Sequence, residues 1–337
     1  MSLRGELLDP AAGPVPPEWG RFVAGQRLTP AWDAAALATL APRHRRLRLG
    51  VVHDEDGVQA VFCGHLRGPA ALPGAFECKL LPMGSTPGFA FARELDPARR
   101  RAAVAAFERA LARRLGWRCV GVIYRQVGKV DLDVCAGPGR LRVTTAPDAV
   151  LENRWATMDE YFAGLSHRRR GRLRAMQRAV ADDPDLVVTV GDGVDGAAAS
   201  RLAFLTELRH HRGWFDAPRQ PIPAAYFDAL ADREGALYLT YRDAAGSLLA
   251  FTLLFDDGER LTSSIWGALH PHDGGRKHLL FDHYLRVIAH AVEHHRLAIS
   301  FSKGQLEAKQ RFGCVPVAQF AVAAVPQVSR LTRRSGT

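Results

Sequence analysis

Residues 278–313 decide the fold, and they read HLLFDHYLRVIAHAVEHHRLAISFSKGQLEAKQRFG. In the first part, large apolar side chains recur on one helix face at Phe281, Leu285, Ile288 and Val292. That spacing predicts an amphipathic α-helix of about five turns. Residues 297–301 are rich in large apolar side chains, so we expect a buried strand directly after the helix. A helix that returns at once to a strand is typical of α/β proteins.

A polar, cationic turn follows the expected strand. It begins with Lys303 beside Gly304, and residues 309–313 then read KQRFG. Because α/β proteins usually hold ligands where strands end, we expect chemistry at this turn. Asp282 and Tyr284 lie early on the helix and are candidates for a general base, although an acid on a helix surface is common.

The composition indicates a globular protein of two domains. The chain has 337 residues, 47% of them hydrophobic and 24% charged, which suits two domains of about 150 residues each. No apolar run approaches the roughly 20 residues that a membrane-spanning helix needs. Residues 1–30 contain acids and several prolines, which predicts an extended lead-in anchored by Trp19 and Phe22 rather than a signal peptide. We therefore expect a cytoplasmic protein.

The spacing of cysteines and histidines argues against a metal site. The cysteines are scattered and never in CxxC spacing, which is typical of reduced thiols. Three histidines share one face of the long helix, at His283, His290 and His294. The last two have a spacing that zinc sites use, but a solvated polar helix face is the commoner explanation. We expect no metal.

Positive charge is concentrated in one segment. The net charge is +10 and the pI near 9.8, which favours acidic or phosphate-bearing partners, although a GC-rich genome also produces arginine-rich proteins. Ser166 precedes a predicted helix with no acid before Ala181, whose arginines are Arg168, Arg169, Arg170, Arg172, Arg174 and Arg178. Repulsion between neighbouring positive charges destabilises a helix modestly, and a negatively charged partner bound to the arginines would relieve it. The alternative is a solvated surface.

The order of predicted elements occurs twice. Residues 47–52 and 58–66 predict a hairpin, followed by a strand near 75–81, a helix after Asp96 and a strand at 119–124. In the second half, strands at 237–241, 248–255 and 261–267 precede the long helix and its strand. Two copies of one α/β unit, in a mixed α+β sheet, are the simplest interpretation.

Three motifs in order resemble a known family. Residues 155–166 read W-x-T-x-D-E-Y-F-A-x-L-S before the arginine-rich helix, residues 246–254 read G-x-L-L-A-F-x-L-L, and K-x-x-F-G ends the unit. Together they resemble the Fem-type branch of the GCN5-related N-acetyltransferase (GNAT) superfamily, over about residues 47–322. The resemblance implies two tandem GNAT-like domains, 1–150 and 151–314. It also implies that a final strand at 315–326 completes the sheet of the first domain.

The resemblance implies amide formation. An amine of a peptidoglycan precursor, a peptide or a secondary metabolite would attack an acyl group carried by aminoacyl-tRNA or by coenzyme A, with no tightly bound cofactor. The loop at Gly274, Gly275, Arg276 and Lys277 stands where GNAT enzymes bind the pyrophosphate of coenzyme A, but it lacks their glycine spacing. The arginine helix favours charged tRNA as the donor. Acyl-CoA and a non-catalytic RNA-binding role are the alternatives.

The resemblance also implies roles for single residues. Lys309, in K-x-x-F-G, would point into the donor cleft and stabilise the negative oxygen of the tetrahedral intermediate, with Lys303 as the second candidate. Trp214 and Phe215 lie in a proline-rich loop and would shape the acceptor pocket. We favour a monomer.

Overall fold

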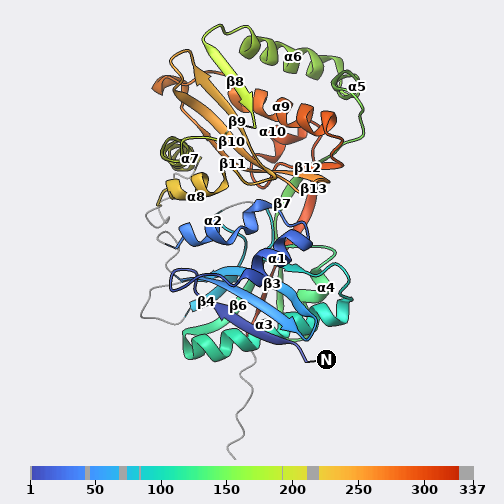
Figure 1. The fold of residues 1–337 in the computed structure, drawn as a ribbon. Coiled ribbons are helices and arrows are strands. Elements are labelled where there is room, and N and C mark those ends of the chain that lie inside the picture. The colour runs from blue at the N-terminus through green and yellow to red at the C-terminus, as the bar shows by residue number, and fades with distance from the viewer. Residues whose placement is uncertain are drawn as a thin grey trace, which may run out of the picture.

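The computed structural model describes residues 2–41, 46–67, 74–82, 85–191, 193–210 and 220–325. Its strands form one continuous mixed sheet, in the order β1-β2-β3-β4-β6-β13-β7-β12-β11-β10-β9-β8, with β5 paired to β3. Figure 1 shows two halves, one above the other, joined through β7 and β13. The predicted α/β class with a mixed sheet is confirmed.

The first half contains the expected hairpin, strand, helix and strand. Its elements are β1 (Arg4–Leu8), α1 (Pro17–Gly25), α2 (Ala34–Thr39), β2 (Leu47–Asp54), β3 (Gly57–Leu66), β4 (Gly74–Cys78), β5 (Phe89–Phe91), α3 (Pro97–Leu115), β6 (Cys119–Gly128) and α4 (Leu132–Cys135). Asp96 caps α3 by accepting a hydrogen bond from the Arg99 amide at 2.8 Å, and Gly116 ends it with φ 54°. The third strand stops earlier than expected, at Cys78.

The second half repeats this order. Its elements are α5 (Met158–Ala163), α6 (His167–Ala181), β8 (Leu186–Val190), α7 (Gly196–His210), α8 (Ala224–Leu230), β9 (Ala236–Asp243), β10 (Leu248–Asp256), β11 (Arg260–Ala268), α9 (Leu279–Glu293), β12 (Ala298–Ser300) and α10 (Leu306–Gln310). In each half a long helix connects two parallel neighbours, α3 between β4 and β6 and α9 between β11 and β12. The repeated unit is therefore present in the topology.

Two strands join the halves. β13 (Val315–Ala324) lies between β6 and β7 and is antiparallel to both. β7 (Leu141–Glu152) pairs with β13 along most of its length and then, at Val150–Glu152, with β12 of the second half. The last described strand of the chain thus returns to the first half.

The N-terminal segment differs from the expected extended lead-in. It forms the edge strand β1 and the helix α1, because Pro17 stands at the start of the helix, where its missing N–H costs nothing. Trp19 and Phe22 are buried, as expected of anchors, and the Trp19 indole donates to the Trp32 carbonyl at 2.8 Å. One core cluster contains residues of α1, α2, α7, α8 and β10, so the two halves share a core.

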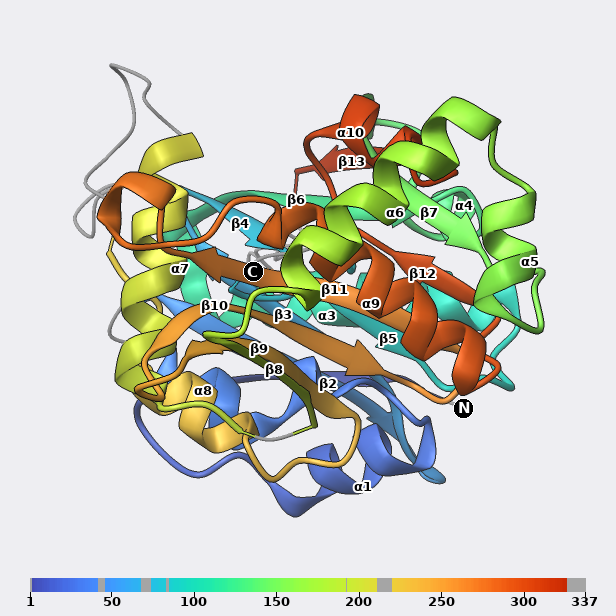
Figure 2. The same ribbon diagram turned by 90° about the horizontal axis from the view of Figure 1, so that it is seen from above.

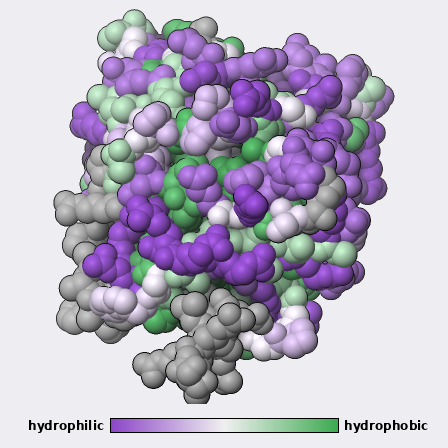
Figure 3. All heavy atoms as spheres, turned by 60° about the horizontal axis from the view of Figure 1, so that its bottom comes forward, coloured by the Kyte–Doolittle hydropathy of each residue, from purple (hydrophilic) through white to green (hydrophobic). Residues whose placement is uncertain are grey.

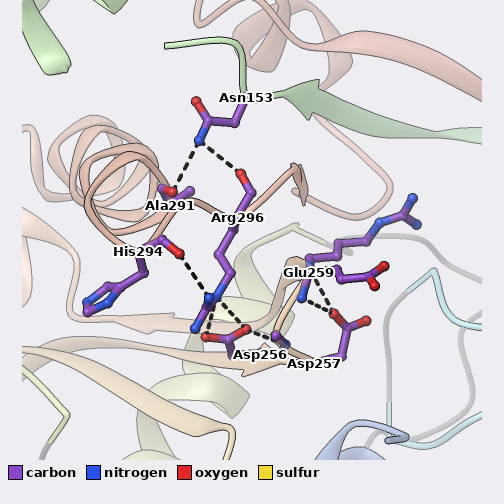
Figure 4. A network of polar contacts seen from close by, with 9 residues as sticks. Asn153, Asp256, Asp257, Glu259, Ala291, His294 and Arg296 are labelled. Carbon is purple, nitrogen blue, oxygen red and sulfur yellow. Dashed lines mark hydrogen bonds and ion pairs between the residues drawn. The ribbon is translucent and has the colours of Figure 1, made fainter. Parts of the chain in front are cut away.

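A polar network fixes the far end of α9 (Figure 4). Asn153, just after β7, donates to the carbonyls of Ala291 and Arg296 at 3.1 and 2.9 Å. Arg296 in turn binds the Asp256 carboxylate at 2.9 Å. These contacts tie the C-terminal end of α9 to β7 and to the end of β10.

Most of the surface seen in one view is hydrophilic. In the view that brings the first half forward, hydrophilic side chains cover most of the face and hydrophobic ones gather in a hollow near its centre (Figure 3). Across the described residues, no helix combines the length and apolar character needed to span a bilayer.

Candidate active site

A cavity opens where two parallel strands separate. β12 pairs with β11 only over Arg260–Thr262, while β11 continues to Ala268 without that neighbour. The space of about 460 Å³ beyond this point is lined by β11, α7, the first turns of α9 and the turn after β12. Ser302 closes its inner end by donating its hydroxyl to the Ser263 carbonyl at 2.9 Å.

Lys309 lines this cavity but its ammonium is fully engaged. The side chain is buried, and Nζ donates to the carbonyls of Phe301, Ser302 and Lys303 at 2.5, 2.9 and 3.1 Å. An ammonium has three N–H donors, so these three contacts use them all. Burial lowers the pKa of Lys309 to about 8, and the Asp148 carboxylate opposes part of that shift. Lys309 therefore holds the shape of the turn.

Lys303 also lines the cavity, and its ammonium is held by fewer contacts than that of Lys309. Its Nζ lies 3.2 Å from the Thr145 hydroxyl, a neutral partner, and it forms no ion pair with any described residue. Burial lowers the pKa of Lys303, while Asp148 raises it. Its neighbours Ser302 and Gly304 have φ of 59° and 81°, so the chain makes a tight turn at Lys303, which is one of the residues that line the cavity.

Aromatic rings of α9 and β11 form another wall. Tyr284 is buried against Phe301 and Phe312, with ring centroids 5.0 and 4.9 Å away, and burial raises the pKa of its hydroxyl. His283 stacks on Trp266 at 4.6 Å and is only 2% exposed. Burial also lowers the pKa of His283 to about 4, so the ring is neutral near pH 7.

Asp282 lies away from the cavity. Its carboxylate accepts hydrogen bonds from the Tyr241 hydroxyl at 2.9 Å and from Arg286 Nε at 2.6 Å. Consecutive residues on a helix point about 100° apart, which separates Asp282 from its neighbour His283. Of the two base candidates on α9, only Tyr284 lines the cavity.

The loop before α9 forms a separate cavity of about 410 Å³, to which Gly275, Arg276 and Lys277 contribute. Gly274 has φ 88°, and a Cβ on Gly275 would lie 2.3 Å from the Leu269 carbonyl, so both glycines are required by the loop itself. Arg276 Nε pairs with the Asp183 carboxylate at 3.1 Å. Arg276, which we expected to bind phosphate, thus has a carboxylate partner within the chain.

Four arginines surround a third cavity, of about 390 Å³, which we call the arginine cavity. Its rim consists of Arg168, Arg169, Arg172 and Arg311, and its apolar side of Leu173, Met176 and Phe281. Among the residues that the structure describes, none that lines this cavity is an acid. Arg174 instead pairs with Asp159 at 2.8 Å, and Arg170 does not line this space. α6 lies along α9 with α10 close by (Figure 2), which brings Arg311 to the helix arginines.

Comparison with known proteins rests on structure alone, because no family model and no curated protein matches the sequence. FemX is similar over 95% of this chain and 97% of its own, with 13% identity and a TM-score of 0.60. L-PGS from Bacillus licheniformis is similar over 94% of each chain, with 14% identity and a TM-score of 0.58. A tandem GNAT protein from the clavulanic acid biosynthesis pathway is similar over 96% of this chain and 99% of its own, with 14% identity and a TM-score of 0.50.

The chain has the tandem GNAT fold. The opening between the parallel strands β11 and β12, beside α9, lies next to the turn where we expected chemistry, and the resemblance is confirmed at the level of fold. Trp214 and Phe215, predicted to shape the acceptor pocket, lie outside the described residues.

Sequence reasoning overlooked two residues of these cavities. Arg311 was overlooked because only the fold places it beside α6. His283 was grouped with a solvated face, but it is buried, in a row with Leu279 and Val287 at spacings of four residues. Those apolar neighbours were the signal that position 283 faces the interior.

Proposed function

We propose that this protein forms amide bonds by transferring an aminoacyl group from aminoacyl-tRNA to an amine of a small molecule or peptide, such as a peptidoglycan precursor or a secondary metabolite. One observation carries the proposal: the cavity at the strand opening and the arginine cavity lie on two sides of the same turns of α9. The similarity to FemX, L-PGS and the tandem GNAT protein supports it.

The two cavities are separated by a thin aromatic layer. Phe281 lines the arginine cavity, Tyr284 lines the cavity at the strand opening, and Phe312 lies between them, with centroids 6.1 and 4.9 Å away. For a carrier held by the arginines, the acyl end would have to pass around this aromatic layer to reach Lys303.

The lining of the arginine cavity suits a nucleotide. Guanidinium groups bind phosphate oxygens in pairs, and an apolar surface with an aromatic ring accepts a base or ribose. Both tRNA and coenzyme A offer these groups. We favour tRNA, because Arg276 is already paired with Asp183 in the loop where coenzyme A would place its pyrophosphate.

The reaction depends more on stabilising the negative charge that develops on the ester carbonyl oxygen than on a strong base. The amine nitrogen bonds to the ester carbonyl carbon, negative charge develops on the carbonyl oxygen, and the bond to the ribose oxygen then breaks as that oxygen gains a proton. We assign charge stabilisation to Lys303, whose ammonium has only a neutral partner. Lys309, with its three carbonyl contacts, positions the turn.

The test offers the protein a mixture of tRNAs charged with labelled amino acids, together with a panel of amines, and separately labelled acetyl-CoA. Product from charged tRNA that disappears after ribonuclease treatment is the expected result. If product forms only from acetyl-CoA, the acyl carrier is coenzyme A and not tRNA. Binding of tRNA with no turnover from either donor would overturn the enzyme proposal and favour an RNA-binding role.

A further inference from the structure

In the imidazole of His283, one ring nitrogen has a hydrogen-bond partner and the other has none among the described residues. Nδ1 lies 2.8 Å from the Leu280 carbonyl oxygen. A carbonyl oxygen only accepts hydrogen bonds, so Nδ1 carries the hydrogen, and in the neutral ring Nε2 then bears a lone pair. The stacked Trp266 ring holds this orientation.

Nε2 is buried and has no hydrogen-bond partner among the described residues. The ring lines the cavity at the strand opening together with Lys303, Lys309, Glu207 and Tyr284. A buried acceptor left unsatisfied costs on the order of 1–3 kcal/mol, and a donor that reaches Nε2 would recover that cost. Lys309 does not supply a donor for Nε2, since it has given its hydrogens to main-chain carbonyls, and an amine that enters the cavity carries one.

We propose that Nε2 of His283 accepts a hydrogen from the attacking amine and is a catalytic residue of the transfer. This inference rests on the proposed function and adds to it the group that receives the proton. As the N–C bond forms, the proton passes from the amine nitrogen to Nε2. As the ester C–O bond breaks, the same proton passes to the departing ribose oxygen, so the ring ends neutral and no external base or cofactor is consumed.

The surroundings keep the ring neutral, so the lone pair on Nε2 is free at neutral pH, although the same surroundings weaken it as a base. Burial and the positive charge of Lys309 lower the pKa of His283, so it is unprotonated across the neutral range, while the Leu280 contact opposes the shift. The acceptor amine must itself enter uncharged, because Lys303 and Lys309 already place positive charge at the cavity. The rings of His290 and His294 contact each other in a tilted arrangement, with centroids 4.2 Å apart, at the other end of α9 and take no part.

The first test reads Nε2 directly, with hydroxylamine as the probe because it is small and uncharged at pH 7.5. Nitrogen-15 NMR of the histidine rings, assigned by comparison with His283→Asn, should show the Nε2 resonance of His283 moving on titration while Nδ1 stays protonated. An Nε2 resonance that does not respond would overturn the inference, whether or not the protein transfers acyl groups.

The second test is kinetic and uses two substitutions. In His283→Asn the side-chain amide can keep the Leu280 contact but offers nothing at Nε2, so kcat with charged tRNA and hydroxylamine should fall about 10²–10⁴-fold. In His283→Ala, added imidazole should restore at least a tenth of the lost rate. Unchanged kcat in His283→Asn would overturn the inference, whereas absence of product from the unaltered protein with either donor would instead overturn the proposed function.

Discussion

Ser300 on β12 donates its hydroxyl to the Asp148 carboxylate on β7, 2.9 and 2.8 Å from its two oxygens, where the two halves of the molecule meet. Both residues are buried, and Ser85 of the first half reaches the same hydroxyl at 3.1 Å. Asp148 also influences Lys303 and Lys309, so this contact connects the junction to the cavity.

Removing the Ser300 hydroxyl should destabilise the fold. Ser300→Ala leaves a buried carboxylate without this donor, and a hydrogen bond to a charged group contributes about 1.5–3 kcal/mol. Ser85→Ala is the matched control, because it removes a neutral hydroxyl contact and should cost about 0.5–1.5 kcal/mol. Urea unfolding at pH 7.5 measures both. Equal losses would show that the carboxylate does not depend on Ser300.

Lys309 should matter for stability. Lys309→Met leaves three buried carbonyl oxygens at the end of β12 without donors, and we expect a loss of about 2–4 kcal/mol. The turn that carries Lys303 should loosen with it. Hydrogen exchange of the amides around Gly304, together with urea unfolding, checks this. A variant as stable as the unaltered protein would contradict the structural role.

Lys303 should matter for catalysis. Lys303→Met loses only a contact to Thr145, so its free energy of unfolding should change by less than about 1 kcal/mol. If its ammonium stabilises the developing oxyanion, kcat should fall about 10²–10³-fold with little change in the donor KM. Full activity in Lys303→Met would show that a group other than Lys303 stabilises the oxyanion.

His283 should make stability depend on pH. An unfolded histidine gains a proton near pH 6.5, whereas buried His283 does so only near pH 4. Between these values the unfolded state binds more protons, so the free energy of unfolding falls as pH falls, by up to about 3 kcal/mol.

His283→Asn lacks this titration and should lose less stability between pH 7 and pH 4.5. His65, whose pKa burial also lowers to about 4, is present in both proteins and cancels in the comparison. Urea unfolding at several pH values gives the two curves. Parallel curves would mean that the ring of His283 titrates normally.

The arginine cavity should set the salt dependence of tRNA binding. Each phosphate contact contributes about 0.7–0.9 to the slope of log K against log salt. Replacing Arg168, Arg169 and Arg172 by Ala should therefore make this negative slope shallower, by about 2–3 in magnitude. The exposed arginines of α3, Arg101, Arg109 and Arg114, provide a control with the same change in net charge. Equal effects of both triple variants would indicate diffuse attraction only.

The sequence by itself determined the repeated α/β unit and the turn that carries Lys303 and Lys309. Helix and strand periodicity, capping by Asp96 and the apolar row of α9 are local, so they can be recognised without knowing what each segment packs against. The order of three short motifs was enough to indicate the tandem GNAT fold.

Only the tertiary structure decided which side chains remain available for chemistry. Lys309 and Lys303 are alike in sequence, yet main-chain carbonyls engage the first and leave the second with a neutral partner. Asp282 and His283 are adjacent, yet one is held by Tyr241 and the other faces a cavity. Burial and hydrogen-bond partners come from segments far apart in the chain, and no local pattern specifies them.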